Sequence, residues 1–161
     1  MNKLFIISQM IIILMVIALF NPLTNMLLTY YYGKQFSLNT KYFYKQIEAE
    51  SSFRCFAYSS AKAIGVGQIT YLTAKYMDSS IKQWQLWLPW VNIQLSAQYT
   101  QYLLHKYKNN YSLALAAYNW GETNVDNKIK YHQIHISSNI NYGFLFKNVS
   151  ETDTFLKTIL D

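Results

Sequence analysis

The chain begins with one long apolar run. From Leu4 to Phe20 it reads LFIISQMIIILMVIALF, in which only Ser8 and Gln9 are polar and no residue is charged. These seventeen residues are enough for a helix that spans a bilayer, or for the hydrophobic part of a secretory signal. The pattern predicts a membrane or export segment over residues 1–33, followed by a domain over residues 34–161.

The residues after the run help to decide between these two interpretations. A cleaved signal ends in small residues, and the sequence from Asn21 to Leu28, NPLTNMLL, offers no such site. We therefore expect an uncleaved signal anchor, that is, a transmembrane helix; a removed signal peptide and a buried core helix are the alternatives. Lys3 precedes the run and Lys34, Lys41 and Lys45 follow it, so the distribution of positive charge does not fix the orientation.

The remaining chain shows the spacing of helices. Residues 33–40 are polar and indicate a linker. Phe43, Ile47 and Glu50 then follow at steps of four and three, which places them on one face of the next helix, with Glu50 pointing inward. Residues 53–67 keep no regular period and indicate a loop. Further helices are expected at residues 71–77, 89–107, 113–119, 125–131 and 152–160, and no strand of useful length, so the predicted fold class is all-α.

Composition narrows the function classes only a little. The net charge of +6 suits an anionic partner such as a lipid headgroup or a wall polymer. The chain has no block of consecutive Lys or Arg, which makes nucleic acid a weak candidate for this partner. The single cysteine, Cys55, excludes an intramolecular disulfide and is expected to be a small buried hydrophobe. Aromatic residues make up 17% of the chain and serve either the core or a stacking surface for sugars.

Three blocks in a fixed order carry a family resemblance. The first is Glu50-Ser51 at a helix end, and the second runs from Ala57 through Gly65 and Gln68 to Thr73-Ala74. Asn92-Ile93 and Tyr99 form a middle helix, and the third block is AAYNWG, residues 116–121, with Val125. Together they resemble the lysozyme-like lytic transglycosylases that carry an SLT domain and cleave peptidoglycan. Tyr142 is the candidate for the late active-site tyrosine of that family.

The resemblance implies a goose-lysozyme-like helical domain with Glu50 as the catalytic residue. In that mechanism Glu50 protonates the bond between N-acetylmuramic acid and N-acetylglucosamine, then removes the proton from the muramyl C6 hydroxyl, which attacks C1 and leaves a 1,6-anhydromuramyl end. The same resemblance implies substrate-binding or supporting roles for a further set of residues: Ser51, Gln68, Tyr118, Asn119 and Tyr142. It implies no cofactor and no metal, and His132-x-x-His135 lacks a third ligand.

The chemistry of glycosidic cleavage points to Glu50 independently of the resemblance. Glycosidic cleavage needs a carboxyl that is protonated near neutral pH, and burial of Glu50 among apolar groups such as Phe53 would raise its pKa. Most glycosidases also use a second carboxylate. Glu48 is turned about 200° away on the helix. Asp78, Glu122 and Asp126 have no context that singles them out, although Glu122 lies beside the third block.

The chain also departs from the family pattern. Lys62 stands where members commonly have Gly, Gly67 where they have Met, Tyr71 where they have Pro, Ser96 where they have Gly, and Trp120 where they have Ala. We therefore expect Lys62 to adopt a backbone conformation that glycine adopts more easily. We expect Gly67 to widen the cleft and Trp120 to add a ring at its edge.

The sequence thus predicts an anchored lytic transglycosylase facing the periplasm or wall, or carried in a phage virion membrane. Its expected partners are peptidoglycan glycan strands, the membrane, and a secretion, conjugation or virion complex that needs local wall opening. The alternatives are a hydrolytic muramidase, a catalytically inactive glycan-binding or structural module, and a basic binder of membrane surfaces or nucleic acid.

Overall fold

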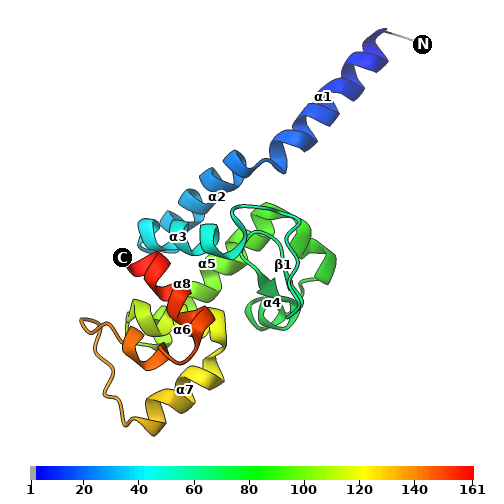
Figure 1. Ribbon diagram of the computed structural model, residues 1–161. Helices are drawn as coiled ribbons and strands as arrows, with labels where there is room; N and C mark the ends of the chain where they lie inside the picture. Colours follow the sequence, from blue (N-terminus) through cyan, green and yellow to red (C-terminus); the bar gives the residue numbers. More distant parts are fainter. Residues whose placement is uncertain (1–2) are drawn as a thin grey trace.

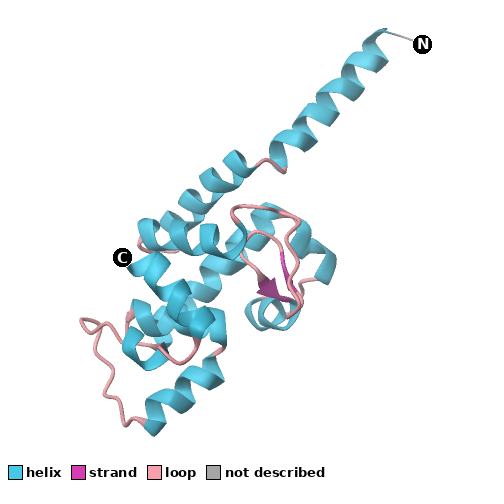
Figure 2. Ribbon diagram, viewed as in Figure 1, coloured by secondary structure: helices cyan, strands magenta, loops and turns pink. Residues whose placement is uncertain are grey.

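The computed structural model describes residues 3–161, so Met1 and Asn2 of the predicted first segment lie outside it. Helices form most of this part of the chain, and the one small sheet within it is an antiparallel hairpin (Figure 1, Figure 2). In chain order the elements are α1 (Lys3–Leu19), α2 (Pro22–Gln35), α3 (Thr40–Ser51), β1 (Ala63–Ile64), β2 (Ile69–Thr70), α4 (Tyr71–Met77), the 3-10 helix η1 (Gln83–Trp87), α5 (Pro89–Lys106), α6 (Tyr111–Trp120), α7 (Glu122–Tyr131), the 3-10 helix η2 (Gly143–Phe146) and α8 (Ser150–Leu160).

Helix α1 projects away from all other elements (Figure 1). None of its side chains is buried, and apolar residues are exposed all around it. Within residues 3–161 no single helix is both long and apolar enough to cross a membrane, and α1 and α2 meet that test only as a pair, bent by 56° at the break between them. The transmembrane helix therefore stays a prediction.

Helix α2 was not expected from the sequence, and it packs against α3 and α5. Its N-cap is Asn21, whose Oδ1 accepts a hydrogen bond from the Leu23 backbone N–H at 2.8 Å. Its buried positions are Asn25, Thr29 and Gly33. The linker predicted to start at residue 33 is therefore wrong, because the helix continues to Gln35; the division of the chain into 1–33 and 34–161 stays a prediction.

The core is organised around α5, which packs against α2, α4, α6 and η1. Helix α6 contributes an unbroken buried stretch from Ser112 to Ala117, whose small side chains let α5, α7 and α8 approach closely. Asn110, and not a later serine, caps α6: the Leu113 N–H donates to its Oδ1 at 3.0 Å. The predicted helical class is confirmed, and the observed helices agree with the expected ones to within a few residues.

The segment predicted as a loop contains the hairpin. Ala63 pairs with Thr70 and Ile64 with Ile69, while Tyr58 forms an isolated bridge with Ile64. Each strand is two residues long, which is too short to produce an alternating pattern. The turn between the strands, residues 65–68, lies against the end of α3 and the start of α5, and it becomes one wall of the site below.

Candidate active site

A cleft of about 560 Å³ opens at the C-terminal end of α3. Its walls come from three places: the junction between α1 and α2, the loop that follows α3, and the hairpin turn. Glu50 contributes an acidic group to it. The lining residues are Phe20, Pro22, Glu50, Phe53, Arg54, Cys55, Phe56, Ala57, Tyr58 and Gln68.

Glu50 lies in the last turn of α3, as its spacing from buried Phe43 and Ile47 predicts. Its Oε1 atom is buried and has no hydrogen-bond partner among residues 3–161. Burial, and secondly the negative charge of Glu151, raise the pKa of Glu50 to about 8. The carboxyl is therefore mostly protonated at neutral pH, which is the state that a general acid needs.

The backbone leaves α3 sharply just after Glu50. Ser52 and Phe53 both adopt the left-handed conformation, with φ of 53° and 60°. Ser51 is buried, and its hydroxyl donates to the Val66 carbonyl at 2.6 Å. Ser51 therefore connects the end of α3 to the hairpin turn. It is not among the residues that line the cleft, so its role is to position Glu50.

Asn92 of α5 holds the hairpin turn from the other side. Its amide nitrogen donates to the Ile64 and Leu86 carbonyls, both at 2.8 Å, and its oxygen accepts from the Gly67 N–H at 2.7 Å. A Cβ on Gly65 would lie 2.4 Å from the Asn92 nitrogen, so only glycine fits there. With the turn fixed in this way, Gln68 projects into the cleft beside Glu50, as predicted, and its Nε2 donates to the Gly65 carbonyl at 2.9 Å.

The third sequence block reaches the site through α6. The Tyr118 hydroxyl donates to the Gly67 carbonyl at 2.7 Å, and burial together with the charge of Glu50 raises the pKa of Tyr118. Tyr118 and Glu50 are thus close enough for their charges to interact, but neither Tyr118 nor Asn119 is among the residues that line the cleft. Asn119 lies behind them: its oxygen accepts from the Thr152 hydroxyl at 2.7 Å, which fastens α8 to α6.

Tyr142, the candidate for the late active-site tyrosine, makes its hydrogen bonds away from Glu50. The Tyr142 hydroxyl donates to the His135 carbonyl at 2.8 Å and accepts from the Ser137 N–H at 3.1 Å. Its own backbone N–H donates to Ser112, in the first turn of α6. Tyr118 lies six residues further along that helix, about 9 Å away. Tyr142 therefore fixes the loop after α7 and is not one of the cleft residues.

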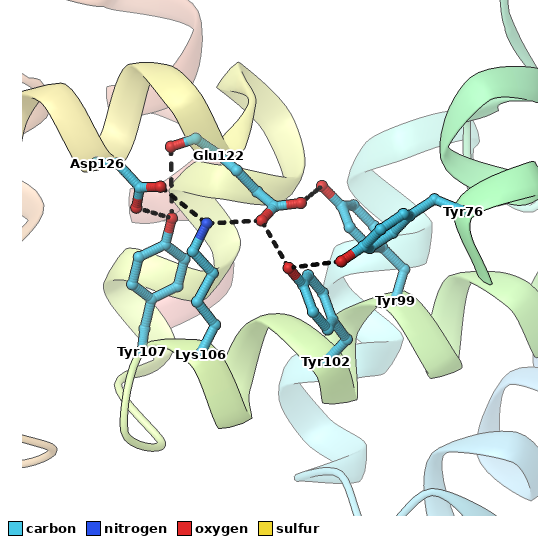
Figure 3. Close-up of polar contacts among 7 residues, drawn as sticks. All are labelled: Tyr76, Tyr99, Tyr102, Lys106, Tyr107, Glu122 and Asp126. Carbon is cyan, nitrogen blue, oxygen red and sulfur yellow. Dashed lines mark hydrogen bonds and ion pairs between the residues drawn. The ribbon is translucent and has the colours of Figure 1, made fainter.

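Glu122, the second carboxylate considered from the sequence, is engaged elsewhere (Figure 3). It accepts hydrogen bonds from the Tyr99 hydroxyl at 3.2 Å and the Tyr102 hydroxyl at 3.1 Å, and it pairs with Lys106 at 2.7 Å. Lys106 also pairs with Asp126 at 2.8 Å. This network joins α5 to α7 and leaves Glu50 as the one carboxyl among the described residues that line the cleft.

Two further acidic residues, Asp78 and Glu151, lie outside this network. Asp78 accepts hydrogen bonds from Ser80, which lower its pKa, and it belongs to the turn after α4. Glu151, in the first turn of α8, is the acid whose charge reaches Glu50. Nothing in the sequence singled out Glu151, because its position beside Glu50 depends on how α8 packs against α3.

The departures from the family pattern have clear structural counterparts. Lys62 has φ of 62°, so it does adopt the left-handed backbone that suits glycine. Gly67 is buried and faces Ser96: a Cβ at this position would lie 2.0 Å from the Ser96 Oγ atom. The expectation that Gly67 widens the cleft is therefore wrong. Trp120 packs edge-on against Phe146 at 6.2 Å and is not one of the cleft residues, so the ring expected at the cleft edge is also wrong.

Comparisons with known proteins agree with this geometry. The model of the transglycosylase SLT domain matches residues 28–141. The chain is similar to an inactive mutant of the lytic transglycosylase Slt from Pseudomonas aeruginosa, with 26% identity, a TM-score of 0.68, and coverage of 80% of this chain and 21% of that one. It is also similar to the 70 kDa soluble lytic transglycosylase from Escherichia coli, with 25% identity, a TM-score of 0.70, and coverage of 83% and 22%. The chain thus spans about a fifth of the length of these proteins.

Replacing Glu50 by Gln is expected to stabilise the fold as pH rises. The pKa of this carboxyl is about 8 in the folded chain against an ordinary value of 4.5, so the folded chain retains the proton and the unfolded chain loses it within that window. Glu50 therefore costs stability progressively from the lower value to the upper one, by at most about 1.4 kcal/mol per pH unit and by less where water screens it. Urea unfolding from about pH 5 to about pH 9 should show Glu50→Gln gaining on the wild type.

The exposed residue Glu48 on the outer face of α3 provides the matched control for this measurement. Glu48→Gln should show no growing advantage. A difference between Glu50→Gln and wild type that stays constant over the whole pH range would contradict the assigned burial of the carboxyl.

The contact between Gly67 and Ser96 predicts a strong coupling. Gly67→Ala alone should lower the free energy of unfolding by about 1–3 kcal/mol, because its Cβ overlaps the Ser96 hydroxyl. Ser96→Gly alone should cost about 1 kcal/mol, as glycine does inside a helix. The double variant should be more stable than the sum of the two losses, as measured by a double-mutant cycle in urea. Simple additivity would show that the two positions do not compete for the same space.

Proposed function

The chain belongs to the transglycosylase SLT domain family, and from this premise we propose that it is a peptidoglycan lytic transglycosylase with Glu50 as its one catalytic carboxyl. The observation that carries the proposal is the burial of that carboxyl in the cleft, where no hydrogen bond of the described chain satisfies Oε1 and the pKa is raised to about 8. The proposed substrate is the bond between N-acetylmuramic acid and N-acetylglucosamine in glycan strands.

In the proposed reaction one carboxyl moves two protons in turn. Protonated Glu50 donates to the glycosidic oxygen as the bond from that oxygen to the muramyl C1 breaks and C1 becomes cationic. The resulting carboxylate then accepts the proton of the muramyl C6 hydroxyl, whose oxygen forms the new bond to C1. The products are a 1,6-anhydromuramyl end and a free N-acetylglucosamine hydroxyl. A raised pKa serves both steps, because it keeps the acid protonated and makes its anion a stronger base.

The surrounding residues position the substrate and the acid. Gln68 lines the cleft that holds Glu50, and because its Nε2 donates to the Gly65 carbonyl, its Oε1 is the atom that would accept a hydrogen bond from the N–H of an N-acetyl group. Tyr118, joined to Gly67, and Ser51, joined to Val66, hold the two sides of the hairpin turn relative to α6 and α3. Asn119 acts one step further out by retaining α8.

A hydrolytic muramidase is the second candidate, and one observation favours it. The negative charge of Glu151 acts on Glu50, so a second acid lies within electrostatic reach of the site. In a hydrolase that acid would activate a water molecule. Glu151 is exposed and is not among the cleft residues, so we place it as an electrostatic neighbour that raises the pKa of Glu50.

We further propose that α1 anchors the enzyme in a membrane with the domain on the wall side. Its seventeen residues extend for about 25 Å, which is shorter than the hydrocarbon core of a bilayer at about 30 Å but long enough to insert deeply into it. Its apolar side chains have no protein partner to cover them, and lipid would do so. An envelope-spanning secretion or conjugation apparatus, or a phage virion, is the setting in which a small anchored enzyme for local wall opening fits.

The product distinguishes the two candidate reactions. Purified peptidoglycan treated with the enzyme should release anhydromuropeptides, which mass spectrometry identifies because they are lighter by one water than hydrolysis products. Glu50→Gln should reduce the rate by on the order of 10²–10⁴, since it removes the acid and the base together. A product set composed only of reducing ends would eliminate the transglycosylase reaction, and equal wall clearing by wild type and Glu50→Gln would leave only a binding module.

The rate should also depend on pH in a defined direction. Only protonated Glu50 can start the reaction, so kcat/KM should be constant below the pKa of about 8 and fall about tenfold per pH unit above it. Glu151→Gln removes the neighbouring negative charge and should move this midpoint to lower pH while anhydro products persist. Complete loss of activity in Glu151→Gln with the fold intact would instead identify Glu151 as a participant and favour hydrolysis.

A further inference from the structure

Five aromatic side chains gather where α1 ends. Phe20 stacks on Phe56 with ring centroids 5.4 Å apart and meets Trp90 edge-on at 6.3 Å. Trp87 joins the group through Phe56 at 6.4 Å and Tyr58 at 6.1 Å. We call these residues, Phe20, Phe56, Tyr58, Trp87 and Trp90, the junction cluster. They come from the α1–α2 junction, the loop after α3, η1 and the first turn of α5.

The junction cluster is placed between the apolar helix and the cleft. Phe20 directly follows α1, whose side chains are exposed, and Phe20, Phe56 and Tyr58 also line the cleft that holds Glu50. Figure 1 shows the loop after α3 at the end of the domain nearest to α1. Phe56 and Tyr58 remain 67% and 59% exposed, so the cluster presents open aromatic surface in the direction from which α1 emerges.

The exposed charged residues of the loop after α3 and of the segment that leads into η1 are cations, while Glu50 lies buried in the cleft beside the cluster. Arg54 and Lys62 flank the exposed rings in the loop, and Lys82 precedes η1; all three are exposed. Neither residues 51–62 nor residues 79–91 contain an acidic residue. Aromatic rings with polar edges and cations that surround them suit the headgroup region of a membrane with anionic lipids.

We infer that the junction cluster is a membrane-interface contact: with α1 inserted, the exposed rings of Phe56 and Tyr58 and the neighbouring Trp87 lie among the lipid headgroups and hold the domain with its Glu50 cleft close to the bilayer surface. This inference rests on the proposed membrane anchor. Its consequence is that the enzyme acts on glycan strands close to the membrane that holds it.

A sugar-stacking surface is the competing interpretation, and the geometry favours lipid. Phe20 and Phe56 stack on one another with their planes only 9° apart, so one face of each ring is already covered and is closed to a sugar. Phe20 and Phe56 also lack polar groups that would bind hydroxyls. In addition, Phe20 lies outside the residues matched by the SLT domain and belongs to the segment that carries α1.

The four tryptophans allow a direct test, because Trp84, Trp87 and Trp90 lie on this side of the chain while Trp120 packs against Phe146. The full chain is reconstituted into vesicles of phosphatidylethanolamine and phosphatidylglycerol as two single-tryptophan variants, one that retains Trp87 and one that retains Trp120. Lipids brominated near the headgroup end of their acyl chains should quench most of the Trp87 emission and little of the Trp120 emission. Acrylamide, which stays in the water, should quench little of the Trp87 emission and more of the Trp120 emission. Each value is compared with that of the same variant in detergent.

A second pair of variants tests the exposed rings themselves. Phe56→Ser with Tyr58→Ser, in the Trp87 reporter, should reduce quenching by lipid and increase quenching by acrylamide. Tyr131→Ser removes an aromatic ring that is 82% exposed on α7 and should change neither. Circular dichroism on each variant establishes that the fold is retained.

The outcomes separate this inference from the proposed anchor. Vesicle flotation is measured first, and a chain that fails to float overturns the anchor and the inference together. A chain that floats while Trp87 is no more quenched by lipid than Trp120 leaves the anchor in place and overturns the inference. Shielding of Trp87 by added glycan strands but not by lipid likewise overturns it and assigns the cluster to sugar stacking.

Discussion

The desolvation of one carboxyl group is the constraint on which the site is built. Glu50 retains its proton at neutral pH chiefly because its carboxyl is buried, with a smaller contribution from the negative charge of Glu151. Three hydrogen bonds keep these parts together, from Ser51 to Val66, from Gly67 to Asn92 and from Tyr118 to Gly67. All of them end in the turn at residues 65–68. The turn is therefore the part of the structure that holds the surroundings of Glu50 together, although it carries no acid itself.

The sequence was sufficient for the parts of the fold with a regular apolar period. Phe43 and Ile47 are buried and Glu50 lies on their face of α3, as their spacing predicts. It was not sufficient for α2, because the buried positions of that helix are Asn25, Thr29 and Gly33. The Asn25 amide nitrogen donates to the Phe53 carbonyl at 2.8 Å, while its Oδ1 is buried without a hydrogen-bond partner among the described residues. A partner 28 residues away cannot be inferred from local pattern.

The candidate site divides in the same way. Gln68 lines the cleft and is held by the Gly65 carbonyl three residues before it, whereas Tyr118 reaches the turn through a hydrogen bond to Gly67, 51 residues away. Tyr142 and Glu151 depend instead on the path of residues 132–149, which have no strong period. That path puts Tyr142 at the start of α6 and α8 against α3, with Glu151 within electrostatic reach of Glu50. The close contact between Gly67 and Ser96 could not be predicted from the sequence either, since only packing brings the two residues together.

That last contact also restricts the order in which this pair of positions can change over time. A lineage that carries Gly67 and Ser96 loses more stability if position 67 changes first, since the Ser96 hydroxyl already occupies the space for the first carbon of a larger side chain. Removal of the serine side chain leaves only a small void, so that step is tolerated and opens the other. Related chains should therefore show a large residue at position 67 only together with glycine at position 96. Packing between Gly67 and Ser96, neither of which lines the cleft, thus sets the order in which this wall of the cleft can change.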